Sequence, residues 1–92
     1  MRAISPSTQF KRDFKQECKR RGKVSLDALL APVLDLLCQD QPLPARMRDH
    51  ALTGPLAGTR ECHLQPDLLL IYFKRADDML VLVRLGSHSE LF

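Results

Sequence analysis

The residue types in this sequence that could carry chemistry are three histidines and a nearby aspartate. His50 lies in an irregular stretch, His63 at the end of an expected strand, and His88 just past another expected strand. Asp67 follows His63 by four residues, across a turn at Pro66. Loops and strand ends are where a rigid scaffold commonly presents functional side chains. The candidate catalytic set is therefore His50, His63, Asp67 and His88.

Two kinds of chemistry fit these side chains. Three imidazoles and a carboxylate could bind a metal ion, but the turn at Pro66 and the lack of a close His/Cys pair disfavour a metal site. The alternative is general acid–base catalysis on a phosphodiester, because imidazoles titrate near neutral pH. RNA needs no metal or cofactor for this, since its own 2′-hydroxyl can attack the adjacent phosphate. We expect Arg60 and Arg84, on neighbouring strands, to bind that phosphate and its developing charge.

The first part of the chain predicts a short strand and two helices. Residues 2–5 suggest the strand, and Ser5-Pro6-Ser7 is typical of a helix start, with Gly22 as the stop. Ser25 is the expected cap of a second helix, whose apolar residues recur at helical spacing up to Cys38. Pro32 lies inside that pattern and is expected to kink or divide the helix.

The remainder of the chain predicts a long irregular stretch followed by three strands. Proline and glycine punctuate residues 40–58, and a loop of this length in a small domain is usually functional. The expected strands are Thr59–Leu64, Leu68–Phe73 and Met79–Leu85, joined by short turns as an antiparallel meander. We therefore expect one α+β domain over residues 1–92, with two N-terminal helices packed on a small, mostly antiparallel four-stranded sheet.

Composition excludes several classes of protein. The chain has 92 residues, 45% of them hydrophobic and 27% charged, as in an ordinary globular domain. No apolar run exceeds six residues, so no membrane span is expected, and no signal peptide is apparent. Three widely spaced cysteines without a CxxC pair suggest the reducing cytoplasm rather than a disulfide framework.

Positive charge is concentrated at the N-terminal end. Residues 1–23 hold eight Lys and Arg against two acidic residues, whereas the rest of the chain is slightly acidic. Such a block suggests an anionic partner, either nucleic acid or an acidic protein segment. The residues expected to contact an RNA backbone from the first helix are Lys11, Arg12, Lys15 and Lys19.

Three ordered motifs in residues 43–92 carry a family resemblance. They are Asp49-His50-x-Leu52-x-Gly54 after Leu43-Pro44, then Gly58-x-Arg60-x-x-His63-x-x-Pro66-Asp67, and finally Arg84-x-Gly86-Ser87-His88-Ser89-Glu90-Leu91-Phe92. Together they resemble the YafQ branch of the RelE toxin superfamily. Position 61, often aspartate in that family, is Glu61 here.

The resemblance implies a RelE-like fold and the toxin of a type II toxin–antitoxin pair. Such a toxin is an endoribonuclease that cleaves mRNA in the ribosomal A site and is silenced by a cognate antitoxin, and the complex is expected to bind its own operator DNA. His50, His63, Asp67, His88 and Phe92 match the family's active-site positions.

We assign expected roles to these five residues from their chemistry. His88 is the general acid that protonates the leaving 5′-oxygen, and either Asp67 or His50 takes the 2′-hydroxyl proton. His63 orients and stabilises, and Phe92 stacks on a splayed base.

Two functions without RNA cleavage are alternatives. The same superfamily fold hosts gyrase-inhibiting toxins of the ParE type, and fold does not fix function. A small basic nucleic-acid-binding module would explain the N-terminal charge but not the C-terminal motif. The set of three histidines favours the nuclease, because neither alternative requires it.

Overall fold

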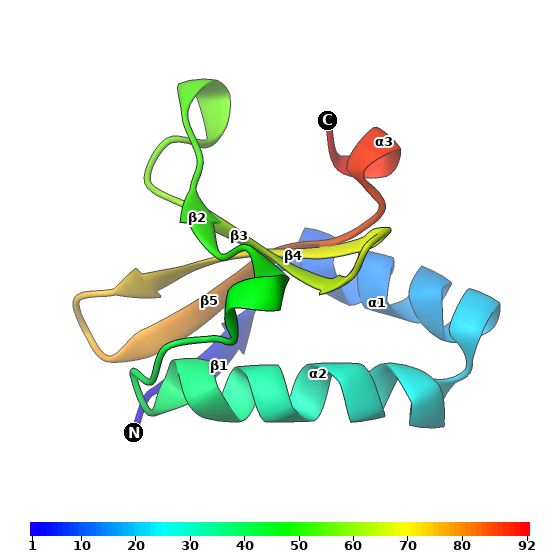
Figure 1. Cartoon of the computed structure of the whole chain (residues 1–92), viewed down its shortest axis with the longest axis horizontal. Coiled ribbons are helices and arrows are strands. Elements are labelled where there is room, and N and C mark those ends of the chain that lie inside the picture. The colour runs from blue at the N-terminus through cyan, green and yellow to red at the C-terminus, as the bar shows by residue number, and fades with distance from the viewer.

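A five-stranded mixed sheet covered on one face by two helices forms the body of the molecule, which we describe from a computed structural model of residues 1–92. The strand order is β1-β5-β4-β3-β2. Figure 1 shows α1 and α2 on one side of the sheet, whereas β2 and α3 rise on the opposite side. The α+β class is as expected, but the strand count of four is wrong.

The extra strand is β2 (His50–Ala51), a two-residue strand inside the stretch expected to be irregular. It pairs antiparallel with β3 (Arg60–Gln65), which continues through β4 (Leu68–Arg75) to β5 (Met79–Gly86) as the predicted meander. Two short 3-10 helices, η1 (Ala45–Met47) and η2 (Gly54–Leu56), flank β2. On the far edge, β1 (Ala3–Pro6) pairs with β5 in parallel.

Helix α1 (Thr8–Arg21) begins later in the chain than a cap at Ser5 would require. Its cap is Ser7, whose hydroxyl accepts a hydrogen bond from the backbone N–H of Phe10, while Pro6 still belongs to the edge strand β1. Proline is tolerated there because an edge strand need not use every N–H group. Gly22 ends the helix at φ +85°, a left-handed conformation that favours glycine.

Helix α2 (Lys23–Cys38) differs from expectation at both Ser25 and Pro32. It starts directly after Gly22, so Ser25 lies in its first turn rather than at the cap. Pro32 neither ends nor divides it, and the helix runs on to Cys38. Pro32 is exposed, so the carbonyl that the missing N–H leaves free on this side of the helix can face water.

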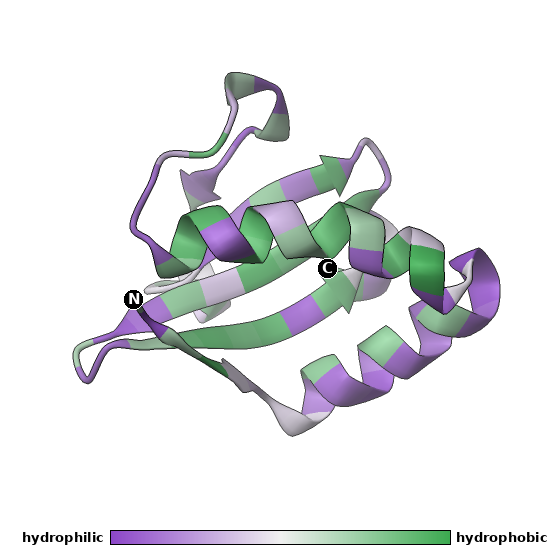
Figure 2. Ribbon diagram, turned by 90° about the horizontal axis from the view of Figure 1, so that it is seen from below, coloured by the Kyte–Doolittle hydropathy of each residue, from purple (hydrophilic) through white to green (hydrophobic).

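The hydrophobic core fills the space between the helices and the sheet. Its members are Phe10, Leu26, Leu30, Val33, Leu37, Cys38, Cys62, Leu64, Leu68, Leu70, Tyr72, Leu80, Leu82 and Leu85. Most helical members come from α2; Figure 2 shows α2 as mainly hydrophobic and α1 as mainly hydrophilic. No helix is long and apolar enough to span a bilayer.

Candidate active site

Alternation along β3 places two polar side chains on the face of the sheet away from the helices. Cys62 and Leu64 belong to the core under α2, so Glu61 and His63, which alternate with them along the strand, point to the other face. Their partners on β4 are Ile71 and Leu69, both fully buried. This second face therefore carries functional groups on an apolar floor.

Glu61 lies between two imidazoles. Its carboxylate oxygens are 3.3 Å from His50 Nε2 and 3.6 Å from His63 Nε2. The carboxylate is almost inaccessible, with 6% of the side chain exposed, whereas 52% of the His50 side chain is exposed. His50 reaches it because His50 and Glu61 are directly paired residues of β2 and β3. We call His50, Glu61 and His63 the imidazole cluster.

The backbone fixes the orientation of His50. Its Nδ1 lies 2.6 Å from the carbonyl oxygen of Arg48. A carbonyl oxygen only accepts, so Nδ1 carries the proton and Nε2 is the nitrogen turned toward Glu61. Arg48 itself has φ +50°, a left-handed conformation that is uncommon for a side chain other than glycine.

The neighbouring Asp49 ties the start of β2 to the sheet. Its Oδ1 accepts a hydrogen bond of 2.6 Å from the buried Tyr72 hydroxyl and one of 3.2 Å from Arg60 Nε. Burial and the Asp49 carboxylate raise the pKa of Tyr72, so its hydroxyl stays a donor. The segment that carries His50 is therefore anchored directly before that residue.

Cys62 lies between Glu61 and His63 in sequence but contributes no nucleophile. It is fully buried on the core face, and burial raises the pKa of its thiol to about 12. A thiol rather than a thiolate is a poor nucleophile. The chemistry available at this site is that of imidazole and carboxylate.

His88 and Phe92 come to the same side of the sheet through α3 (His88–Leu91). Their rings are in contact, with centroids 4.8 Å apart. Ser87 caps the helix in a reciprocal arrangement: its hydroxyl accepts from the Glu90 N–H, and its own N–H donates to the Glu90 carboxylate. A side chain at Gly86 would crowd Leu91, because its Cβ would lie 3.3 Å from Leu91 Cδ2.

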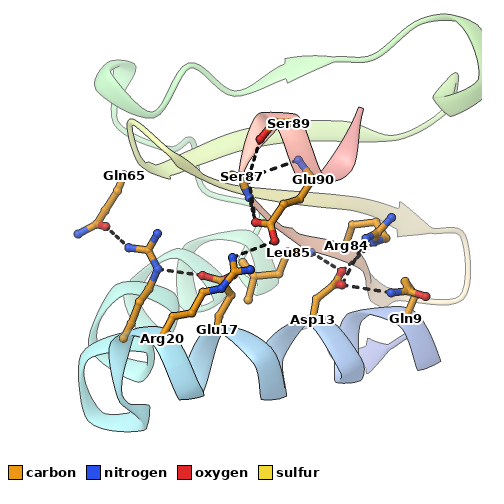
Figure 3. Close-up of polar contacts among 11 residues, drawn as sticks. Gln9, Asp13, Glu17, Arg20, Gln65, Arg84, Leu85, Ser87, Ser89 and Glu90 are labelled. Atoms are coloured by element: carbon orange, nitrogen blue, oxygen red, sulfur yellow. Dashed lines mark hydrogen bonds and ion pairs between the residues drawn. The ribbon is translucent and has the colours of Figure 1, made fainter.

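Helix α1 holds α3 in place through a chain of ion pairs (Figure 3). Arg20 Nη1 bridges Glu90 Oε2 at 2.8 Å and the buried Glu17 carboxylate at 3.1 Å. Glu17 also pairs with Arg21, whose Nη1 donates to Gln65 Oε1 at 2.6 Å. We call Glu17, Arg20 and Glu90 the α1–α3 latch.

The expectation that Arg60 and Arg84 lie on neighbouring strands is wrong. Strand β4 separates β3 from β5, and each guanidinium pairs with a different carboxylate. Arg60 binds Asp49, and Arg84 Nε binds Asp13 of α1 at 2.7 Å. Both charges are thereby partly neutralised within the protein.

The other candidate residues form no ion pair with the imidazole cluster. Asp67 is exposed in the turn between β3 and β4 and makes no hydrogen bond or ion pair with a histidine. Four of the six basic residues of α1 are exposed and form no ion pair; they are Lys11, Arg12, Lys15 and Lys19. Figure 1 places their helix on the opposite side of the sheet from β2 and α3.

The sequence contained a signal for Glu61 that the candidate set left out. Glu61 and His63 are two residues apart in an alternating strand, so they share a face. What could not be foreseen is that β2 forms and pairs His50 with Glu61.

Comparison with known proteins identifies the family. The family model described as "Bacterial toxin of type II toxin-antitoxin system, YafQ" matches residues 2–92. The chain belongs to the YafQ family. It is 37% identical over 91 residues to the mRNA interferase toxin YafQ of Escherichia coli, covering 99% of this chain and 96% of that protein.

Solved structures of YafQ-like toxins share the fold. A metal-bound toxin from Helicobacter pylori is 45% identical with a TM-score of 0.89, and each chain is covered completely. The toxin in the E. coli DinJ–YafQ toxin–antitoxin complex is 37% identical with a TM-score of 0.82, covering 99% of this chain and 97% of that one. In this YafQ-family chain, no three His, Cys, Asp or Glu side chains are grouped to hold a metal ion.

Proposed function

We propose that this YafQ-family toxin is a ribosome-dependent endoribonuclease that cleaves mRNA in the A site. The observation that carries the proposal is the imidazole cluster on the open face of the sheet, with His88 and Phe92 delivered to the same side by α3. Imidazoles at such a face suit proton transfer to and from RNA near neutral pH. The name mRNA interferase, given to the E. coli relative, supports the same activity.

The proposed reaction needs one base and one acid. His50 is our preferred base over Asp67, because its Nδ1–H is held by the Arg48 carbonyl and its Nε2 can accept the 2′-hydroxyl proton beside Glu61. The 2′-oxygen then attacks the phosphorus, and His88 gives its proton to the leaving 5′-oxygen. The product ends are a 2′,3′-cyclic phosphate and a 5′-hydroxyl. His63 orients the phosphate, and Phe92 stacks on a base.

The proposed partners are mRNA, the ribosome and a cognate antitoxin. The antitoxin is proposed because a relative is found in a DinJ–YafQ toxin–antitoxin complex. We also propose that the complex of this toxin with its antitoxin binds its own operator DNA. Because the proposed reaction takes place on ribosomes, the proposed location of the toxin is the cytoplasm.

The decisive experiment is His88→Ala, expressed in cells without antitoxin and assayed with purified ribosomes. We expect cleavage and growth arrest to be lost, because one acid–base partner supplies about 10²–10⁴ in rate. Far-UV circular dichroism and antitoxin binding should match the parent. A folded variant that still cleaves mRNA would exclude His88 as the acid, and gyrase inhibition without cleavage by the parent would point to a ParE-like toxin.

The proposed mechanism is independent of metal ions. Cleavage should persist after the toxin is treated with EDTA and then added to ribosomes in buffer that contains only the Mg²⁺ they require. Because one similar toxin is metal-bound, zinc and copper should be added back separately. Activity that is lost with EDTA and restored by either ion would contradict the proposal.

A further inference from the structure

A cavity of about 510 Å³ opens at the edge of the imidazole cluster, where His63 forms part of its lining. Its lining includes Leu29 of α2, Arg46 of η1, Arg48, and His63 and Gln65 of β3. The cavity therefore borders the proposed reaction site on one side and η1 on the other.

The two arginines in this lining have no carboxylate partner. Of the 14 lysines and arginines, eight form ion pairs within the chain, and the remaining six are the four exposed residues of α1 together with Arg46 and Arg48. Near the histidines, free guanidinium groups thus occur only here. An unpaired arginine fork is suited to a phosphate, which it can bind through two parallel hydrogen bonds.

The rest of the lining adds donors and no negative charge. No aspartate or glutamate lines the cavity. The side-chain oxygen of Gln65 is already taken by Arg21 at 2.6 Å, so the amide N–H groups of Gln65 are the part left to bind a ligand (Figure 3). A cavity that offers donors and positive charge favours an anion.

The strand that borders the cavity is only partly paired on its outer side. Strand β2 pairs only with Arg60 and Glu61, so the rest of β3 has no strand partner on that side and lies next to η1. Arg48 links this edge to the cluster, because its carbonyl orients His50 while its side chain lines the cavity. A left-handed residue with a large side chain at this position is consistent with a functional constraint.

We propose that this cavity binds a backbone phosphate of the RNA substrate through Arg46 and Arg48. The inference rests on the proposed nuclease function and adds a second phosphate subsite to it, distinct from the phosphate that reacts. Contacts of this kind hold the register of the strand and carry no base preference. The subsite fixes where the strand lies relative to His63, whereas base choice is made elsewhere.

The test measures binding separately from cleavage. The probe is a short single-stranded RNA oligonucleotide with 2′-O-methyl groups, which cannot be cleaved by 2′-hydroxyl attack. The Arg46→Gln/Arg48→Gln variant should bind it about tenfold to a hundredfold more weakly, which corresponds to about 1.4–2.8 kcal/mol, because the charged hydrogen bonds from both guanidinium groups are removed. The slope of log K against log salt should become shallower by about 0.7, for one phosphate on a single strand.

Two controls isolate the cavity from net charge and from folding. Lys23→Gln/Arg75→Gln removes the same number of charges from the exposed ion pairs with Asp27 and Asp77 and should bind like the parent. Arg46→Lys/Arg48→Lys keeps the charge without the fork and should lie between the two. Thermal unfolding of every variant reports whether the fold is intact, and the single substitutions replace the double variant if it unfolds.

The outcomes separate this proposal from the function on which it rests. His88→Ala should bind the probe like the parent although it does not cleave, and a parent that binds the probe but cleaves nothing on ribosomes would contradict only the nuclease. An Arg46→Gln/Arg48→Gln variant with the affinity and salt slope of the parent would overturn the subsite. So would a variant that binds RNA normally but loses affinity for the antitoxin, because the cavity would then bind an acidic segment of that protein.

Discussion

At the scale of single residues, the site is organised around a buried carboxylate. Glu61 is held at two imidazoles, and its other neighbours on the face are the apolar Ile71 and Leu69. A negative charge there favours a proton on either ring, so it stabilises the imidazolium that forms when a histidine acts as a base. The carboxylate thus assists the proposed proton transfer from a position 3.3 Å from His50 Nε2, the nitrogen that accepts the proton.

We predict that Glu61→Gln slows cleavage by about 10² while the protein still folds and binds RNA. The amide keeps the shape of the side chain but cannot stabilise a proton on His50 or His63. Cleavage rates on ribosomes provide the measurement. Glu61→Asp, which keeps the charge, serves as the control and should retain more activity. Equal rates for Glu61→Gln and the parent would show that the carboxylate is not involved.

At the scale of elements, α1 has two separate functions on two faces. On its inward face, Asp13 binds Arg84, and Glu17 pairs with Arg20 as part of the α1–α3 latch. Its outward basic residues have no partner in the chain and lie on the helix side of the sheet. They are therefore placed to contact RNA at a distance from the imidazole cluster. If the toxin acts in the A site as proposed, the RNA that they contact is ribosomal RNA.

We predict that Lys11→Gln/Lys15→Gln/Lys19→Gln weakens ribosome binding and flattens its salt dependence. If each lysine neutralises one phosphate of a duplex-like RNA, the salt slope should fall by about 2.7. The pattern of cleaved codons should stay the same, because phosphate contacts do not read bases. The substitutions leave Arg20 and the α1–α3 latch intact, so α3 keeps its position. Ribosome sedimentation at several salt concentrations provides the measurement, and unchanged binding throughout would remove α1 from the RNA-facing surface.

At the scale of the whole molecule, carboxylates add polar links between α1 and the sheet to the core contacts that Phe10 makes. Asp13 of α1 accepts hydrogen bonds from Arg84 Nε at 2.7 Å and from the Leu85 N–H at 3.0 Å, and so attaches the helix to β5. Burial acts to raise the pKa of the Asp13 carboxyl, but the bonds from Arg84, Leu85 and Gln9 outweigh it and lower that pKa. The pKa of Glu90 in the α1–α3 latch is also lowered, mainly by the Ser87 N–H and hydroxyl.

We predict that acid destabilises the fold partly through Asp13. The pKa of Asp13 is lower in the folded chain than the ordinary 3.8. The contribution of its carboxylate to the free energy of unfolding is therefore complete above pH 3.8 and is lost as the pH falls through the pKa of the folded state. Asp13→Asn should lower the free energy of unfolding at neutral pH by about 1–3 kcal/mol and make the decline below about pH 4 shallower. Chemical denaturation across pH provides the measurement. Asp27→Asn, at an exposed pair on α2, is the control; identical acid profiles for Asp13→Asn and the parent would contradict the assignment.

Much of the architecture could be predicted because local sequence patterns indicate most of its helices and strands. Alternation located β3, continuous apolar runs bounded by turns located β4 and β5, and Gly22 marked the end of the first helix. The prediction that Pro32 divides its helix was wrong, because burial of neighbouring residues such as Leu30 and Val33 stabilises the helix on both sides of the proline. The two-residue β2 and the pairing of His50 with Glu61 could not be foreseen, since such a strand has no periodicity of its own. The ion pairs of Arg60 and Arg84 join residues 11 and 71 positions apart, which no local pattern reports.

The parallel pairing of β1 with β5 also sets the order in which the molecule can be completed during its own synthesis. Ala3 pairs with Met79 and Pro6 with Leu82, so the first strand leaves the ribosome long before its partner exists. Helix α1 must wait as well, because Asp13 binds Arg84 and the Leu85 backbone. Strand β5 and α3 are translated after all of these elements, and α3 carries His88. A nascent chain therefore has no assembled site until α3 has been synthesised, and an antitoxin already present can bind the toxin as soon as that site forms.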